Sequence, residues 1–578
     1  MLRGTTYALL EFRGSRSVVG ELTWSQWSTL HDIRAREPEG YRTNVMQEVT
    51  VENCMLEDML QTLRVLVERH ESLRTRYIFD ANGCRQSVAA DGSISVVLNE
   101  VEDDDYHEAS KELGEQLQNR SFDLANDWPL RIGVVTTRGV PRYVVLVMSH
   151  MAVDAWSANL LRLELSYLIG SPKRRSRSRC MSLNYRSPVD QADYERSSRG
   201  ESASRKAIAY FKEQLSIIPH TVFSNGSEVP SIPRWWGGFL DSQALALSVR
   251  ILSDRYKVTP ATLLLAATAI ILGYRAEVDR FGCISLAGNR FAQESCEYVG
   301  TLVQGVVTSV DLCDTEFSQF VRRTHVAALS AYRHGWFDFR KQQTLIDQVT
   351  LERGLNLDLG YFNFHHDFTD HQPYAQIQRL PADVLAMRAA TRFSWSEKKS
   401  HHDCVNYYMR VIPQTDVMTL ALFVDTVCIS LADAKAILYG IESTLVEAVS
   451  RDFRISEINE IAGVSRPTRD STWIRIDGSW VSLTATESLL RDAIDLFSLR
   501  VFVDGQTQQL VAFLVPQRSN LTPVEIHRLC VSFLPQHKTA MTPQWYVICD
   551  SVPTKGDGPD AWAQQAVLTE GNGRDSIQ

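Results

Sequence analysis

The sequence has little that would suit a metal centre, a dithiol redox motif or a secreted protein. It contains 10 cysteines, and no two of them form a C-x-x-C pair. Zinc sites and dithiol redox motifs commonly use such a pair, so neither is indicated. The first residues lead into no apolar signal core. Scattered cysteines without a signal sequence predict a cytoplasmic protein with reduced thiols.

Long apolar runs and clustered positive charge are also scarce. The most apolar stretch, residues 261–274, is about one buried helix long, whereas a membrane span needs about 20 residues. The formal net charge is -9, and a nucleic-acid-binding face normally needs concentrated Lys and Arg. We therefore expect no membrane-embedded segment and no nucleic-acid partner.

What the chain does contain is typical of large globular cores. Hydrophobic residues make up 44% of its 578 residues, and there are 12 Trp. A chain of this length usually forms several domains. Changes in the pattern of apolar and polar residues, together with two polar connecting stretches, predict three domains: residues 1–180, 181–455 and 456–578. Helical and strand-like segments alternate in each, which predicts a mixed α/β (α+β) protein.

Apolar spacing predicts the main elements. In the first region we expect a helix over residues 57–70, a strand over 143–148, and a following helix that packs through Val153, Trp156, Leu160, Leu161, Leu163 and Leu168. In the second we expect helices over 260–272 and 431–449 and strands over 281–287, 305–311 and 357–364. In the third we expect strands over 499–503, 510–515 and 545–549 and a helix over 523–533.

One histidine stands where a scaffold commonly presents a side chain to a cleft. His150 comes directly after the strand over 143–148 and before the next helix. An unperturbed imidazole has a pKa of about 6.5, which suits proton transfer near neutrality. From spacing alone, a hydrogen-bonded core histidine is the simpler interpretation, and both stay open at this point.

Five segments in chain order resemble motifs of the condensation domain of nonribosomal peptide synthetases, a member of the chloramphenicol-acetyltransferase-like superfamily. They are L-T-W-S-Q at 22–26, R-H-E-S-L-R-T-R-Y at 69–77, V-M-S-H-M-A-V-D-A-W-S at 147–157, Q-A-D-Y-E at 191–195 and Y-V-G-T-L-V-Q at 298–304. The third resembles the family's H-H-x-x-x-D-G-x-S active-site motif, with His150 at its second histidine.

The resemblance implies two acetyltransferase-like lobes in a V-shaped pseudo-dimer, ahead of the small third domain. It implies an acyltransferase that joins a thioester donor to an amine or hydroxyl acceptor in natural-product biosynthesis, such as that of peptide antibiotics. His150 would be the catalytic residue. No tightly bound cofactor is implied, because both substrates would arrive on the phosphopantetheine of peptidyl or aminoacyl carrier proteins. We expect a free-standing enzyme of secondary metabolism.

The residues around His150 carry the supporting roles. The family's first histidine is replaced by Ser149 and its glycine by Ala155, which affects the expected substrate range more than the chemistry. The resemblance makes Asp154 a structural ion-pair partner of Arg290, and an exposed helix cap is the alternative role for Asp154. Trp156 and Ser157 are candidates for lining the acyl channel.

The third region resembles the small subdomain of amino-acid adenylation domains. Residues 534–543 (L-P-Q-H-K-T-A-M-T-P) resemble its L-P-x-y-M-x-P segment, and residues 552–560 resemble a degraded P-x-T-x-N-G-K-x-D loop. Pro559 stands where that family has its adenylate-binding lysine. The large adenylation core has no counterpart, so we expect a docking or structural unit without ATP chemistry, with a separate adenylation protein as a further partner.

Three other segments are alternative candidates for functional sites. Residues 365–370 spell H-H-x-x-x-D literally, but the polar residues and Pro373 that follow do not continue into a helix. Residues 401–404 (H-H-D-C) are more simply an exposed loop than a metal site, because consecutive side chains diverge. The basic run 173–179 is interpreted as an exposed connector, with attraction of an acidic carrier-protein helix or RNA as the alternative.

Two other functions remain compatible with these residues. Ser149, Ala155 and Pro559 would suit a non-catalytic scaffold that recruits carrier proteins. An acyltransferase that uses a soluble donor such as acyl-CoA is the second alternative.

Overall fold

The computed structural model describes residues 5–81, 83–102, 105–169, 186–219, 231–291, 293–357, 359–365, 381–396, 405–518 and 520–574. The chain divides into two compact units. The first combines residues 1–207 with 287–304 and 334–340; the second combines 208–286, 305–333 and 341–578. The predicted mixed α/β class is confirmed. The division into three domains at residues 180 and 455 stays a prediction.

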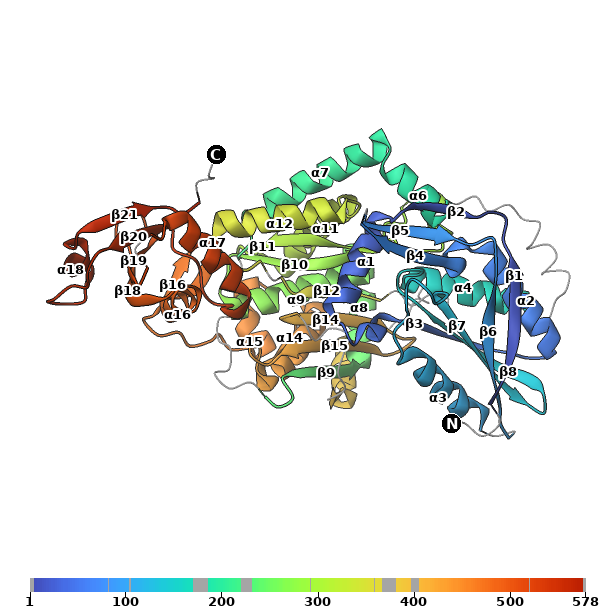
Figure 1. Cartoon of the computed structure of the whole chain (residues 1–578). Helices are drawn as coiled ribbons and strands as arrows, with labels where there is room; N and C mark the ends of the chain where they lie inside the picture. Colours follow the sequence, from blue (N-terminus) through green and yellow to red (C-terminus); the bar gives the residue numbers. More distant parts are fainter. Residues whose placement is uncertain are drawn as a thin grey trace. The chain divides into compact units, whose positions relative to one another are not determined.

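A five-stranded sheet forms the centre of the first unit (Figure 1). Its strands, in spatial order, are β1 (Thr5–Arg13), β6 (Asp91–Glu100), β7 (Leu130–Thr137), β8 (Val140–Met148) and β3 (Val45–Thr50). Only β6 and β7 run parallel. A smaller sheet has the order β2 (Val18–Glu21), β5 (Gly83–Val88) and β4 (Thr75–Asp80). Other helices described in this unit are α1 (Trp24–Ala35), α6 (Pro188–Glu195) and the short α10 (Gln293–Cys296).

Helices cover both faces of the five-stranded sheet. Helices α2 (Leu56–Arg69) and α4 (Ala155–Leu168) pack on one face, and α3 (Tyr106–Gln118) packs on the other. Strand β8 is therefore buried on both sides, which explains why its sequence is a continuous apolar run rather than an alternating one. Val299 joins the core beneath α2 and α4, so the segment 287–304 is tied into this unit by packing.

A seven-stranded sheet forms the centre of the second unit. Its strands, in spatial order, are β11 (Gln304–Asp311), β10 (Arg280–Ala287), β12 (Tyr361–Phe364), β14 (Tyr407–Pro413), β15 (Met418–Asp425), β9 (Trp235–Ser242) and β13 (Arg392–Ser396). Helices α8 (Gln243–Tyr256), α9 (Pro260–Ala276) and α14 (Leu431–Ser450) pack on one another, and α8 and α14 lie against β9 or β15. The other helices are α7 (Ser198–Leu215), whose residues are divided between the two units, α11 (Phe317–Arg333), α12 (Phe339–Arg353), α13 (Pro381–Met387) and α15 (Ile458–Ala462).

Among the described residues, no single helix is long and apolar enough to cross a membrane. Helices α8 and α9 together meet that test by length and composition, as a pair bent by 106°. Most of the α9 side chains are buried in the core of the second unit.

The C-terminal residues form a smaller layer of strands and helices within the second unit (Figure 1, orange to red). A four-stranded sheet has the order β18 (Leu496–Val503), β19 (Leu510–Pro516), β20 (Trp545–Cys549) and β21 (Val567–Gly571). It is accompanied by a hairpin of β16 (Trp473–Ile476) and β17 (Ser479–Ser482) and by helices α16 (Leu483–Ala493), α17 (Pro523–Phe533) and α18 (Pro559–Ala563). We refer to residues 473–574 as the C-terminal layer.

Polar contacts fasten the C-terminal layer to the end of α12. The Nε2 atom of His527 lies 2.8 Å from the carbonyl oxygen of Leu351. Arg574 donates from Nε to the carbonyl oxygen of Glu352 at 2.9 Å, and Arg353 donates from Nε to Asp477 at 2.8 Å. Two of these contacts satisfy carbonyl groups that the helix end leaves without intrahelical partners.

The predicted elements are largely present, with two differences. The expected strand over 357–364 is confined to Tyr361–Phe364. Leu163, expected to pack on the sheet, is 44% exposed because it lies on the outer side of α4. Many described elements were not predicted, among them helix α16 and the hairpin β16–β17 of the C-terminal layer.

We predict that the attachment of the C-terminal layer weakens in acid. Burial lowers the pKa of His527 from 6.5 to about 4, with a smaller effect from the charge of Arg574. The unfolded chain therefore binds a proton more readily than the folded chain between those values, and stability falls as the pH decreases from about 6.5 to about 4. The loss should approach about 3 kcal/mol.

Urea unfolding at several pH values, followed by fluorescence, measures this effect. His527→Gln, which does not titrate in this range, should show a flatter dependence on pH below 6.5. Identical pH profiles for both proteins would contradict the prediction.

Candidate active site

The site lies where the central strand β8 ends and α4 begins. Strand β8 stops at Met148, and the backbone N–H of Ser149 donates to Pro129 at 3.0 Å. A tight turn follows, closed by a hydrogen bond from the N–H of Ala152 to the carbonyl of Ser149 at 2.9 Å. Residue 150 therefore sits at the tip of a turn between the buried strand β8 and helix α4, one face of which is buried.

His150 is half-buried, and its Nδ1 atom is fully buried. This nitrogen has no hydrogen-bond partner among the described residues. A core histidine held in place by hydrogen bonds would have its buried ring nitrogen satisfied, because buried polar atoms without partners are rare. No described residue therefore fixes the His150 ring by a hydrogen bond at Nδ1.

Asp154 anchors the turn from its other end. It is 2% exposed and caps α4 by accepting a hydrogen bond from the N–H of Ser157 at 2.9 Å. Arg290 contacts both of its carboxylate oxygens, Nη1 to Oδ2 and Nη2 to Oδ1, each at 2.8 Å. The N–H of Leu302 adds a third donor at 3.0 Å. The cap and the ion pair, expected as alternatives, are formed by the same carboxylate.

The ionised form of Asp154 is stabilised although the group is buried. Burial by itself would raise its pKa, but the charge and hydrogen bonds of Arg290 and the N–H groups of Leu302 and Ser157 hold it below its usual value. The side chains of Arg290 and Asp154 are only 4% and 3% exposed. A bidentate arginine with additional donors is the arrangement that best offsets the cost of burying such a pair.

The predicted neighbours occupy different environments. Ser157 is fully buried; its hydroxyl donates to Gly300 at 2.6 Å and accepts from Arg290 at 2.8 Å. Trp156 donates from its indole nitrogen to the carbonyl of Cys296 at 3.0 Å. Ser149 is 2% exposed, whereas Ala155 is exposed at the first turn of α4. Lining of an acyl channel by Trp156 and Ser157 stays a prediction.

Several residues that contribute to the site were not predicted from the sequence. Tyr77 donates its phenolic hydroxyl to the carbonyl of Met151 at 3.0 Å, which holds the turn from the side of β4. Tyr77 and Glu195 are the last residues of two of the segments that resemble family motifs. Their place in these segments is the feature of the sequence that could have identified them. Trp336, which donates to Glu195 at 3.1 Å, lies in none of the five segments that resemble family motifs.

The competing segments lie almost entirely outside the described residues. His365 is described, and its Nε2 atom lies 3.1 Å from Asn363, but residues 366–370 lie outside the described ones. Residues 401–404 and 173–179 also lie outside them. Within the described part of the chain, no group of His, Cys, Asp or Glu side chains could hold a metal ion.

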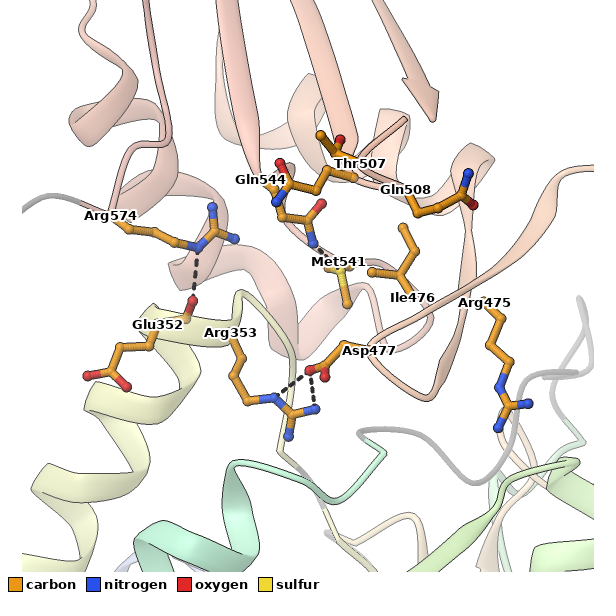
Figure 2. Close-up of a pocket in the computed structure, with 11 residues that line it drawn as sticks. Glu352, Arg353, Arg475, Ile476, Asp477, Thr507, Gln508, Met541, Gln544 and Arg574 are labelled. Carbon is orange, nitrogen blue, oxygen red and sulfur yellow. Dashed lines mark hydrogen bonds and ion pairs between the residues drawn. The ribbon is translucent and has the colours of Figure 1, made fainter. Parts of the chain in front are cut away.

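A separate pocket of about 450 Å³ lies in the second unit, where the C-terminal layer meets α12 (Figure 2). Three arginines contribute to its wall. Arg353 is paired with Asp477, Arg475 is paired with Asp279, and Arg574 donates to backbone carbonyls and to Thr542. Because these guanidinium groups are already engaged by the protein, the pocket is best interpreted as a seam between packed layers.

Comparisons with known proteins add an independent result. A family model described as "Condensation domain" matches residues 25–372. The chain is 27% identical over 309 residues to a linear gramicidin synthase of Brevibacillus parabrevis, a match that covers 51% of this chain and 6% of that protein. It is 23% identical over 303 residues to a chondramide synthase of Chondromyces crocatus, over 51% of this chain and 8% of that protein. The chain therefore spans only a small part of the length of these relatives.

Solved structures show the same fold. A condensation domain that mediates chain release from the enacyloxin polyketide synthase is similar with a TM-score of 0.59 and 15% identity, over 78% of this chain and 85% of that one. The SgcC5 protein of Streptomyces globisporus is similar with a TM-score of 0.56 and 16% identity, over 75% of this chain and 99% of that one.

We predict that Arg290→Met destabilises the first unit strongly. The substitution leaves the buried Asp154 carboxylate without its cation, a loss that typically costs about 3–5 kcal/mol. Asp154→Asn combined with Arg290→Met removes both charges and should recover part of this loss. Urea unfolding of the wild type and the two variants measures the effect.

Arg454→Met is the matched control, because Arg454 pairs with Asp314 while 52% exposed. Exposed pairs contribute about 0–1 kcal/mol, so this variant should unfold near the wild type. Equal losses of unfolding free energy in Arg290→Met and Arg454→Met would show that the buried pair of Asp154 and Arg290 stabilises the protein no more than an exposed pair does.

Proposed function

Because the chain belongs to the condensation-domain family, we propose that it transfers an acyl group from a carrier-protein thioester to an amine or hydroxyl acceptor, with His150 as the catalytic residue. Members of this family catalyse amide- or ester-forming acyl transfer, and they work with carrier-protein domains and without a tightly bound cofactor. The observation that carries the proposal for His150 is its turn, which presents a half-buried imidazole between β8 and the Asp154-capped α4.

The proposed reaction needs little besides positioning and one proton transfer. The acceptor nitrogen attacks the thioester carbonyl, a C–N bond forms, the C–S bond breaks, and the proton of the amine ends on the departing thiol. An α-amine has a reference pKa of about 7.7–8.0, so part of it is already neutral near pH 7. His150 serves the attack by accepting the amine proton or by orienting the amine through a hydrogen bond.

Holding two tethered substrates together contributes a large share of the rate. Proximity and orientation can supply about 7–11 kcal/mol of the barrier. A fixed imidazole is useful only if its backbone is fixed, and the buried pair of Asp154 and Arg290 supplies that constraint. We assign Asp154 and Arg290 to positioning rather than to proton transfer, since both charges are already engaged by each other.

For the C-terminal layer we propose a structural or docking role without ATP chemistry. Pro559 opens the short helix α18, where the adenylation family resembled by this region has a lysine. Asp557 in the same loop is held by Arg500 and by the indole of Trp562. Lys538 is directed to Asn406 and Asp425 of the neighbouring sheet. These engagements support a role in packing; pairing with a separate adenylation protein remains part of the proposal.

The test is intact-mass analysis of donor and acceptor carrier proteins loaded with candidate groups. His150→Ala should slow transfer about 10²–10⁴-fold, the usual contribution of one acid–base group. His366→Ala is the control, because it alters the competing histidine motif and should retain the wild-type rate.

The other outcomes separate the alternatives. Equal rates for His150→Ala and the wild type would contradict the catalytic role of His150. Carrier binding without transfer would favour the scaffold, and transfer from acyl-CoA but not from a carrier would favour a soluble donor.

A further inference from the structure

A buried glutamate of the first unit has no cationic partner among the described residues. Glu195 ends α6 and is fully buried. Its Oε2 accepts from the backbone N–H of Trp24 at 2.7 Å, and its Oε1 accepts from the side chains of Gln191 and Trp336, each at 3.1 Å. Within the described part of the chain, no Lys, Arg or His forms an ion pair with it. Burial raises its pKa to about 7, against the effect of these three hydrogen bonds.

Such a group is costly to keep in a core. A buried carboxyl without a counter-ion is unfavourable compared with an apolar side chain of similar size. Part of the cost is offset by helix α1, because the N–H of Trp24 lies in its first turn, where the helix dipole favours negative charge. Thr23 already caps the N–H of Gln26, so Glu195 supplies a second acceptor to the same helix end.

Trp336 connects this carboxyl to the segment 334–340. Its ring stacks on Tyr194 at 5.2 Å between centroids and lies 5.5 Å from the ring of Trp24. Its indole N–H has Glu195 as acceptor. The segment 334–340 is therefore held against α1 and α6 by ring contacts and by one hydrogen bond to a buried carboxyl.

The same segment holds both ends of the loop that carries Arg290. Asn289 donates to the carbonyl of Gly335 and to that of Leu302, both at 2.8 Å. Gln304 donates to the carbonyl of Phe337 at 2.9 Å. Asn289 directly precedes Arg290, and the N–H of Leu302 donates to Asp154.

We propose that Glu195 is a positioning residue for the acyl-transfer site. Glu195 holds segment 334–340 in place, and this segment keeps Arg290 and Leu302 in contact with Asp154, which caps the helix that follows His150. This inference rests on the proposed function of His150 for its kinetic part and on the structure alone for its mechanical part. The chain of contacts runs from Glu195 through Trp336 to Asn289 and Gln304.

Two substitutions disturb the first link with little change in shape. Glu195→Gln is isosteric, but its NH₂ group must face either the N–H of Trp24 or the donors of Gln191 and Trp336, so the three acceptor contacts can no longer all form. Trp336→Phe keeps an aromatic ring beside Tyr194 and removes the N–H that binds Glu195. Glu195→Gln also removes a buried ionisable group whose ionisation opposes folding above pH 7. In that pH range the denaturant concentration at the unfolding midpoint should therefore be unchanged or higher in the variant.

We expect each variant to lower kcat about tenfold while KM changes less than twofold, since an interaction that positions the reacting groups acts mainly on kcat. The double variant should be no slower than the single ones, because both remove the same link. Gln191→Met is the matched control: it removes a partner of Glu195 on its own helix, leaves Trp336 in place, and should retain kcat.

Hydrogen–deuterium exchange tests the mechanical part without any substrate. Amide exchange over residues 287–304 should rise in Glu195→Gln and Trp336→Phe but not in Gln191→Met. Unchanged exchange in the first two variants would overturn the proposal even if the enzyme is active. Raised exchange in a protein that transfers no acyl group would support the link and count against the proposed function instead. Additive losses of kcat in the double variant would also overturn the shared link.

Discussion

The buried pair of Asp154 and Arg290 is the constraint on which the candidate site depends. It joins residues 136 positions apart, and both side chains are almost inaccessible to water. Burying two charges is costly, so the pair is stable only because the carboxylate also receives the N–H groups of Ser157 and Leu302. The turn that carries His150 is thereby fixed from both sides, by the end of β8 and by the cap of α4.

The imidazole at this turn has fixed surroundings rather than a free carboxylate beside it. Asp154 is committed to Arg290 and to two backbone donors, so it has little capacity left to act as a base. The segment 287–304 then behaves as a structural insert of the first unit, with Val299 in the hydrophobic core and Arg290 at the site. Packing and electrostatics thus act on the same segment, which explains how a loop distant in sequence can be held precisely.

The sequence predicted those features that depend on local pattern. Amphipathic spacing predicted α2 as Leu56–Arg69 within one residue, and the continuous apolar run predicted β8. The pairing of Asp154 with Arg290 came from family resemblance, because spacing carries no information about contacts 136 residues apart. The contact between Glu195 and Trp336 could not be predicted, since it arises only when α6 and residues 334–340 meet. Leu163 shows the opposite failure, an apolar residue that the fold leaves exposed.

Two of the buried carboxyls of the first unit, those of Asp154 and Glu195, show how charge can specify geometry. Asp154 is compensated by a cation and stays ionised, whereas Glu195 relies on neutral donors and has its pKa raised to about 7. An apolar residue at either position would avoid the desolvation cost but would accept no hydrogen bonds. Each carboxyl accepts donors from separate segments, so each can be satisfied in only one arrangement of those segments. Apolar packing alone is less directional, so the polar links add directional constraints to the packing that already holds the loop around Arg290.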